Sequence, residues 1–148
     1  MPKTNASQAS TQNRIAILAV LPREDYRSLH SILEHSNWTV QAAATVAEGL
    51  RLLKDGSVPV VLCERDLPDG DWKDLLEAVA QHEQPSNLVV ASRLADECLW
   101  AEVLNLGGYD VLTIPFDTNE VFRVLNMAWH QWHDRMRAAR PVSMAASI

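Results

Sequence analysis

The chain has few cysteines and glycines and no long hydrophobic run. Its two cysteines, Cys63 and Cys98, lack the spacing of a metal site, so we expect two buried thiols and no disulfide. The five glycines form neither a dinucleotide-binding fingerprint nor the Gly-x-Ser-x-Gly turn of serine hydrolases. No apolar run approaches the roughly 20 residues that a membrane-spanning helix needs. We therefore expect a cytoplasmic chain without a membrane partner and without enzymatic activity.

Positive charge is scarce as well. The 148 residues include 13 Lys and Arg against 19 Asp and Glu, which gives a formal net charge of -6. Nucleic-acid binding needs clustered basic side chains, so we expect no nucleic-acid partner. Hydrophobic residues make up 47% of the chain, which is enough for the core of one domain without disulfides.

Apolar runs of strand length alternate with segments of helical periodicity. Each run precedes a stretch whose apolar residues recur every three or four positions, which predicts five strands and five helices. Runs that are apolar throughout are typical of parallel strands covered by helices on both faces. The sequence therefore predicts a doubly wound α/β domain with a five-stranded parallel sheet. The predicted strands are 15–20, 38–43, 58–63, 88–91 and 110–113.

Local signals place the ends of the domain and of several helices. Residues 1–13 are polar, and we expect a disordered tail there, followed by one domain at 14–138 and a second tail at 139–148. Thr45 with Glu48 predicts a helix start, and so does Asp117 at the beginning of the last helix. Glycines at 107 and 108 predict a helix end. We expect the last helix to fray near 140–141, where a proline follows an arginine.

The predicted third strand runs directly into Glu64 and then into a turn with Pro68 and Gly70. Functional groups of open α/β sheets lie at this carboxyl edge. The segment resembles the phosphoacceptor strand of response-regulator receiver domains, in which an aspartate stands four residues before a proline. The resemblance covers roughly residues 14–137. It implies a flavodoxin-like fold with strand order 2-1-3-4-5, used in two-component (phosphorelay) signal transduction.

The residues that the family uses for phosphoryl transfer are replaced in this chain. Glu64 stands at the phosphoacceptor-equivalent position. The acidic pair that holds Mg²⁺ in the family falls on Ala19 and Val20, counted from Pro22, and neither can bind a metal. The acids Glu24 and Asp25 follow, and negative charge in the first turn of a helix is favoured there in any case. We interpret them as helix-end charges rather than displaced metal ligands.

Two further positions carry the resemblance. The lysine that precedes a proline in the family corresponds to Ile114, which cannot neutralise phosphoryl charge, and the resemblance implies a cis bond between Ile114 and Pro115. The aromatic switch position falls on Val111. Ser92 matches the switch hydroxyl of the family, although a serine at a strand end is equally typical of a turn.

Taken together, these replacements predict a degenerate pseudo-receiver, an atypical receiver that is independent of phosphorylation and acts through protein–protein contacts. We expect no catalytic residue, no metal and no cofactor. The resemblance implies that the partner, a kinase or an output protein, docks on helix 4, strand 5 and helix 5, where Trp100, Tyr109 and Trp129 mark the expected interaction face. A homodimer through this face is a further hypothesis.

Several alternatives stay open. Glu64 either provides a fixed negative charge in place of a phosphoryl group or is a solvated acid, and residual phosphorylation of Glu64 is a second hypothesis. A third is a small-molecule sensor whose pocket is lined by the five positions discussed above. His130 and His133, three residues apart, favour a solvated helix face over a metal site. The pocket of the third hypothesis would comprise Ala19, Val20, Glu64, Ser92 and Ile114.

Overall fold

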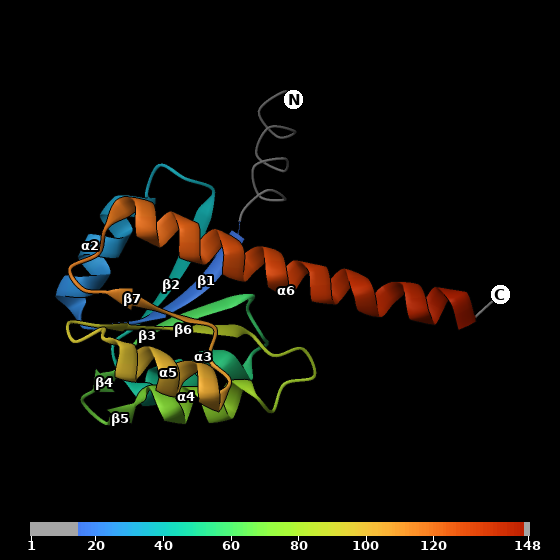
Figure 1. The fold of residues 1–148 in the computed structure, drawn as a ribbon, viewed down its shortest axis with the longest axis horizontal. Coiled ribbons are helices and arrows are strands. Elements are labelled where there is room, and N and C mark those ends of the chain that lie inside the picture. The colour runs from blue at the N-terminus through green and yellow to red at the C-terminus, as the bar shows by residue number, and fades with distance from the viewer. Residues whose placement is uncertain (1–14, 147–148) are drawn as a thin grey trace.

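Five parallel strands form one sheet in the computed structural model, which describes the backbone of residues 15–146 and the side chains as far as residue 139. The strand order is β2-β1-β3-β6-β7, which confirms the predicted order 2-1-3-4-5, because β6 and β7 are the fourth and fifth strands of this sheet (Figure 1). The bounds of the strands are β1 Ile15–Val20, β2 Trp38–Ala43, β3 Val60–Glu64, β6 Asn87–Ser92 and β7 Asp110–Thr113.

Helices cover both faces of the sheet. In Figure 1, α2 and α6 lie on one side, and α3, α4 and α5 lie on the other. The predicted doubly wound arrangement with five helices is therefore confirmed within the described residues. Their bounds are α2 Arg23–Leu33, α3 Val46–Lys54, α4 Trp72–Val79, α5 Glu97–Leu106 and α6 Thr118–Ala146.

Two hydrophobic cores result from the alternation of side chains along the strands. Ile17 of β1 and Leu62 of β3 point to the core under α2 and α6, whereas Leu18 and Val61 point to the core under the other three helices. All four side chains are buried. Because both faces of the central strands are covered, their sequences are apolar throughout rather than alternating.

The predicted helix ends are confirmed by capping contacts. The Thr45 hydroxyl accepts a hydrogen bond of 3.1 Å from the Glu48 amide at the start of α3. The Asp117 carboxylate accepts one of 2.9 Å from the Glu120 amide at the start of α6. At the end of α5, Gly107 has a φ of 106°, a left-handed conformation that glycine adopts without strain.

The last helix differs from its prediction. It continues to Ala146 instead of fraying near 140–141, so residues 139–146, expected as a tail, are helical. Alanines on both sides of Pro141 favour helix and offset part of the cost of a proline inside a helix, which removes one backbone donor and crowds the preceding turn. With 29 residues, α6 is about 44 Å long and extends beyond the body of the domain (Figure 1).

A two-stranded hairpin that the sequence analysis did not predict follows β3. It consists of β4 Asp66–Leu67 and β5 Gly70–Asp71, which pair antiparallel. At its tip, the two carboxylate oxygens of Asp69 accept hydrogen bonds of 2.7 and 3.0 Å from the amides of Val46 and Ala47, at the start of α3. These backbone amides lower the pKa of Asp69. The hairpin is thus fastened to a helix of the main domain.

The two cysteines occupy different environments. Cys63, in β3, is fully buried, and this burial raises the pKa of its thiol. Cys98, expected to be buried, is exposed on α5, because the buried face of that helix is formed by Leu99 and Val103. Both thiols are free. None of the described helices combines the length and the apolar character that a membrane crossing requires.

Candidate functional site

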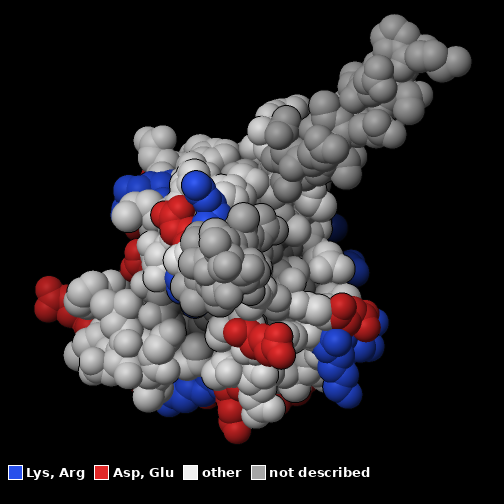
Figure 2. All heavy atoms as spheres, turned by 90° about the vertical axis from the view of Figure 1, so that its right-hand side faces the viewer, with Lys and Arg blue, Asp and Glu red and all other residues white. Residues whose placement is uncertain are grey.

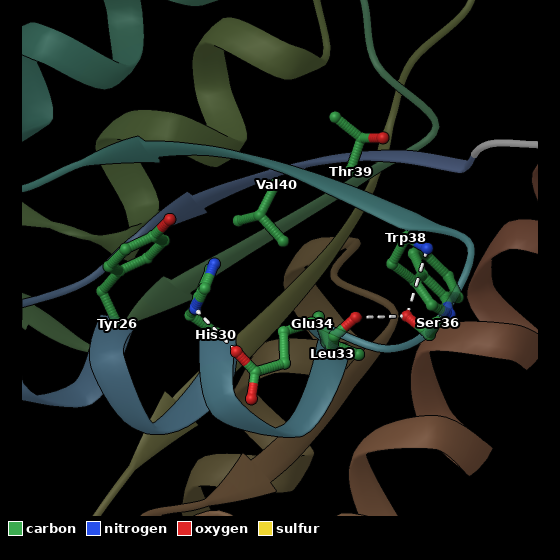
Figure 3. A pocket seen from close by; sticks show the side chains of 8 residues that line it. All are labelled: Tyr26, His30, Leu33, Glu34, Ser36, Trp38, Thr39 and Val40. Carbon is green, nitrogen blue, oxygen red and sulfur yellow. Dashed lines mark hydrogen bonds and ion pairs between the residues drawn. The ribbon is translucent and has the colours of Figure 1, made fainter. Parts of the chain in front are cut away.

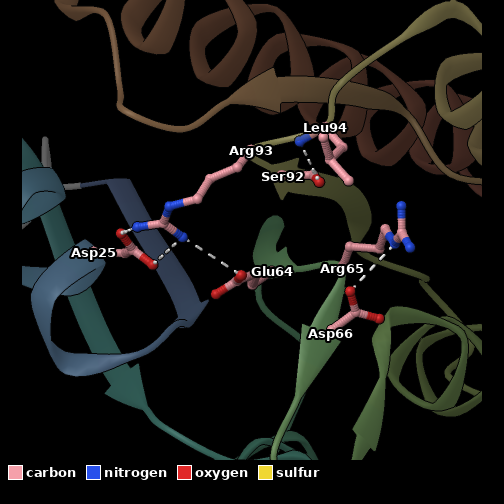
Figure 4. A network of polar contacts seen from close by, with 7 residues as sticks. All are labelled: Asp25, Glu64, Arg65, Asp66, Ser92, Arg93 and Leu94. Atoms are coloured by element: carbon pink, nitrogen blue, oxygen red, sulfur yellow. Dashed lines mark hydrogen bonds and ion pairs between the residues drawn. The ribbon is translucent and has the colours of Figure 1, made fainter.

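Three charged side chains from distant parts of the sequence meet at the carboxyl edge of the sheet (Figure 4). Asp25 comes from the first turn of α2, Glu64 from the end of β3, and Arg93 from the loop after β6. The Arg93 Nη2 atom lies 2.9 Å from Asp25 Oδ1, and Arg93 Nη1 lies 3.7 Å from Glu64 Oε1. The guanidinium thus bridges two carboxylates. We call Asp25, Glu64 and Arg93 the arginine cluster.

The cluster is buried at its acidic end and open at its basic end. The exposed fraction of the side chain is 7% for Asp25, 17% for Glu64 and 56% for Arg93. Burial raises the pKa of Glu64, the Asp25 carboxylate raises it further, and Arg93 opposes both with a smaller effect. Hydrogen bonding and charge attraction from Asp25 raise the pKa of Arg93. The second oxygen of Glu64, Oε2, is buried and has no hydrogen-bond partner among the described residues.

The arginine cluster corrects the interpretation of Asp25. The residue lies in the first turn of α2, as expected, but its side chain is buried and binds Arg93 instead of only complementing the helix end. The sequence analysis missed Arg93 altogether. A signal existed, because Arg93 is the first residue after a buried strand that leads to the functional edge.

The positions that the sequence analysis assigned to the family's acidic pair and lysine carry core side chains. Ala19 and Val20 are completely buried, and Ile114 is 4% exposed, so all three belong to the hydrophobic cores. The bond between Ile114 and Pro115 is cis. Mg²⁺ does not fit this edge, because Ala19 and Val20 offer no oxygen ligand and the nearest acids already bind Arg93. Among the described residues, no three histidine, cysteine, aspartate or glutamate side chains converge as metal ligands.

Ser92 lies at the end of β6, where its side chain shapes the following loop. Its hydroxyl oxygen accepts a hydrogen bond of 3.0 Å from the Leu94 amide, across Arg93. This contact is typical of a serine turn. Ser92 therefore fixes the loop from which Arg93 reaches across the edge of the sheet (Figure 4).

Residues 24–126 match the family model described as "Response regulator receiver domain". This match includes all three members of the arginine cluster and most of the sheet. The chain belongs to the response-regulator receiver domain family. It is thus a receiver domain of a response regulator in two-component signalling. Receiver domains are signalling modules that interact with proteins such as kinases or output domains.

The receiver domain is similar to proteins from several bacteria. It is 24% identical over 99 residues to the acid tolerance regulatory protein ActR of Rhizobium meliloti, which covers 67% of this chain and 51% of ActR, so the chain spans about half the length of that relative. A signal receiver domain of an HD domain-containing protein from Pseudomonas fluorescens Pf-5 is 25% identical, with a TM-score of 0.76 and coverages of 84% and 93%. The non-phosphorylated HemR receiver domain from Leptospira biflexa is 24% identical, with a TM-score of 0.69 and coverages of 78% and 94%.

Hollows on the receiver domain bear on the small-molecule hypothesis. Beside Arg93 lies one of about 320 Å³ that reaches Asp25 and Ile114. It does not include the other four positions expected to line a ligand pocket, which are Ala19, Val20, Glu64 and Ser92. A larger hollow of about 420 Å³ lies between α2 and β2, away from this edge (Figure 3), and its lining includes Tyr26, His30, Glu34 and Trp38. No specific observation therefore favours a ligand pocket at Glu64.

The aromatic residues of the expected interaction face differ in exposure. Trp100 on α5 is 50% exposed, and its indole nitrogen donates a hydrogen bond of 3.2 Å to Asp110. Tyr109 and Trp129 are half-buried and pack against the core under α6. The Trp129 ring stacks on the ring of His133, with centroids 4.8 Å apart. Trp100 is thus the most accessible of the three predicted contact residues.

Charged side chains on the receiver domain are mixed in sign. Figure 2 shows the side from which α6 extends, where Lys and Arg atoms are interspersed with Asp and Glu atoms. The described residues visible there form no continuous patch of one sign.

Proposed function

We propose that this receiver domain signals without being phosphorylated and acts through contacts with a protein partner. The observation that carries the proposal is the arginine cluster, in which Arg93 already binds Asp25 and Glu64. In the family, by resemblance, a metal ion and a lysine supply positive charge at this edge. Here Ile114 replaces the lysine, and the remaining cation is engaged by two carboxylates.

Electrostatics and geometry both oppose transfer of a phosphoryl group to Glu64. Phosphoryl transfer depends on positive groups that neutralise charge in the transition state. The two carboxylates and one guanidinium of the cluster sum to a negative charge, so an incoming phosphoryl group would be repelled. In addition, Glu64 Oε2 is buried, and the side chain carries one more methylene than an aspartate.

The test is a titration with Mg²⁺ and beryllofluoride, a mimic of the phosphoryl group, followed by tryptophan fluorescence. Trp72 is a suitable reporter, because its amide donates a hydrogen bond of 3.1 Å to the Arg65 carbonyl, directly after Glu64. We expect no saturable change in fluorescence. Glu64→Asp should not restore a response either, because Ala19 and Val20 still offer no metal ligand.

A saturable, Mg²⁺-dependent change that Glu64→Ala abolishes would contradict the proposal and favour residual phosphorylation of Glu64. Trp72→Phe serves as the optical control, because it removes the reporter but keeps the cluster. If Trp72→Phe still shows the fluorescence change, the change arises from another tryptophan. That tryptophan would then be identified by substitution before a conclusion about Glu64 is drawn.

We infer that the partner docks on the face formed by α5, β7 and α6, with Trp100 as its most exposed aromatic contact. Exposed aromatic side chains are common anchors of protein interfaces. We also propose that the domain acts in the cytoplasm. In a second arrangement, another copy of this chain occupies the same face. Analytical ultracentrifugation distinguishes the two arrangements. If the chain is a dimer, Trp100→Ala should weaken it, whereas Arg51→Ala on α3 should not.

A further inference from the structure

The arginine cluster lacks one positive charge. Two carboxylates, Asp25 and Glu64, share the single guanidinium of Arg93. Uncompensated charge at a largely buried position is unfavourable, because the surroundings solvate it poorly. The cluster would therefore be stabilised by one further positive charge at Glu64.

The groups around Glu64 do not supply that charge. The neighbouring strand β1 ends in Ala19 and Val20, and β7 is followed by Ile114, all of which are apolar. Asp66, which follows β3, adds negative charge near Glu64 and is itself paired with Arg65 at 3.3 Å.

The remaining acid of the first turn of α2, Glu24, faces Arg93 and acts on it as a further negative charge. Apart from Arg93, no cation among the described residues forms an ion pair with Glu64. None of the described elements packed against Glu64 therefore supplies the missing positive charge.

A proton can fill this shortfall. Glu64 Oε2 is buried and makes no hydrogen bond within the described residues, so a hydrated cation or the side chain of a partner cannot reach it from solvent. Protonation of the carboxylate neutralises the whole cluster. It also provides an O–H group beside the Asp25 carboxylate, which can accept its hydrogen bond.

We propose that the arginine cluster is a pH-sensitive latch on the loop between β6 and α5: in acid, Glu64 takes up a proton and its ion pair with Arg93 is lost. The second anchor of Arg93 is Asp25, whose carboxylate accepts a hydrogen bond of 2.9 Å from Arg93 Nη2 that does not pass through Glu64. The direction of the Glu64 pKa supports this order of events, since burial and Asp25 both raise it.

The loop connects the latch to the expected docking face. Arg93 stands between Ser92, which is buried, and Leu94, which is 67% exposed. Release of one of its two anchors would change the position of Leu94 beside α5. The effect of the loop on a docked partner rests on the proposed function. The uptake of the proton does not, because it needs no partner.

The proton is measured directly by carbon-detected NMR of the glutamate carboxyl groups as a function of pH. We expect a Glu64 midpoint above 4.5, its ordinary value. Asp25→Asn should lower the midpoint by about one pH unit, because it removes a like charge. Arg93→Ala should raise it, because it removes an opposite charge. Glu77→Gln, an exposed acid on α4, is the matched control and should leave it unchanged.

The amides of Arg93 and Leu94 report on the loop in the same samples. We expect their chemical shifts to titrate with the same midpoint as the Glu64 carboxyl. In Glu64→Gln, which carries no charge, these shifts at neutral pH should match those of the unsubstituted protein in acid. This variant keeps the proposal testable if Arg93→Ala does not fold.

A Glu64 midpoint at or below 4.5 would overturn the latch, and so would a midpoint that Asp25→Asn does not lower. Loop amides in Glu64→Gln that match the unsubstituted protein at neutral pH would also overturn it. Failure of the proposed function is a separate outcome. A saturable response to Mg²⁺ and beryllofluoride would show that failure, whereas the titration of the Glu64 carboxyl would be unaffected by it.

Discussion

Glu64 ends β3 and Asp69 lies at the tip of the hairpin that follows, and their surroundings shift the pKa of the two carboxyl groups in opposite directions. Asp69 is exposed and accepts hydrogen bonds from two backbone amides at the start of α3, which lower its pKa. Glu64 is largely buried beside Asp25, and its pKa is raised. Backbone amides do not titrate, so the hydrogen bonds that hold Asp69 at the start of α3 are available at every pH at which Asp69 is charged. Glu64 is paired with a single cation, Arg93, whose effect on its pKa is smaller than those of burial and Asp25, so its charge is sensitive to pH.

The largest effect is expected from removing the large buried side chain next to the hairpin. Trp72 is 2% exposed and follows the hairpin directly. Trp72→Ala should lower the free energy of unfolding by about 3–5 kcal/mol, because it leaves a large cavity in the core under α3, α4 and α5. Urea denaturation followed by circular dichroism measures this change. The control is Trp100→Ala, on the exposed side of α5, where a loss of the same size would show that burial does not govern the difference.

The next effect concerns the cation on which Glu64 depends. Arg93→Ala should lower the urea midpoint at pH 7, because Asp25 and Glu64 are left without a counter-charge. Arg51→Ala, another exposed arginine, should change the midpoint less. Equal midpoints for the two variants would mean that the arginine cluster does not stabilise the fold.

A smaller loss of stability is expected when the Asp69 side chain is removed. Asp69→Ala should lower the urea midpoint less than Arg93→Ala, because Asp69 is exposed and water can replace its carboxylate at the Ala47 amide, which is also exposed. Hydrogen exchange at the amides of Val46 and Ala47 should become faster, while Asp69→Asn, which keeps one acceptor oxygen, should have an intermediate rate. Unchanged exchange in Asp69→Ala would show that the two hydrogen bonds do not hold the hairpin.

The smallest effect is a pH dependence of opposite sign for the two acids. A carboxyl whose pKa is raised by folding stabilises the fold below its unfolded value, and this stability is lost as the pH rises through the folded value. Glu64→Gln should therefore gain stability relative to the unsubstituted protein as the pH rises above 4.5, until the raised pKa is passed. Asp69, whose pKa is lowered, stabilises the fold above its ordinary value of 3.8, so Asp69→Asn should lose stability relative to the unsubstituted protein as the pH rises towards 3.8. Urea midpoints measured on both sides of 3.8 and 4.5 would contradict the prediction if the two differences changed in the same direction with rising pH.

The sequence predicted the sheet well because parallel strands covered on both faces are written as continuous apolar runs. The strand 110–113 was predicted with the bounds that β7 has, and the caps at Thr45 and Gly107 follow from local chemistry. The two short strands of the hairpin were missed because two residues carry no periodicity. Cys98 was misplaced because the sequence did not show which face of α5 is buried.

The candidate site was predictable only in part. Counting from Pro22, Pro68 and Pro115 placed Ala19, Val20, Glu64 and Ile114 at the functional edge, because such turns keep their distance from the strand ends. Arg93 was missed because its partner Asp25 lies 68 residues away in the sequence. No local pattern joins residues that far apart.

The sequence by itself determined the succession of strands and helices, and it predicted that apolar residues stand at the positions of the family's metal ligands and lysine. Both depend on the local order of residue types, which periodicity and spacing record. Only the tertiary structure decided that Asp25 turns inward, that Arg93 reaches it, and that Glu64 has a buried oxygen with no hydrogen-bond partner in the described part of the chain. Those outcomes depend on how α2, β3 and β6 meet at one edge of the sheet, because charge, burial and distance act between neighbours in space rather than along the chain.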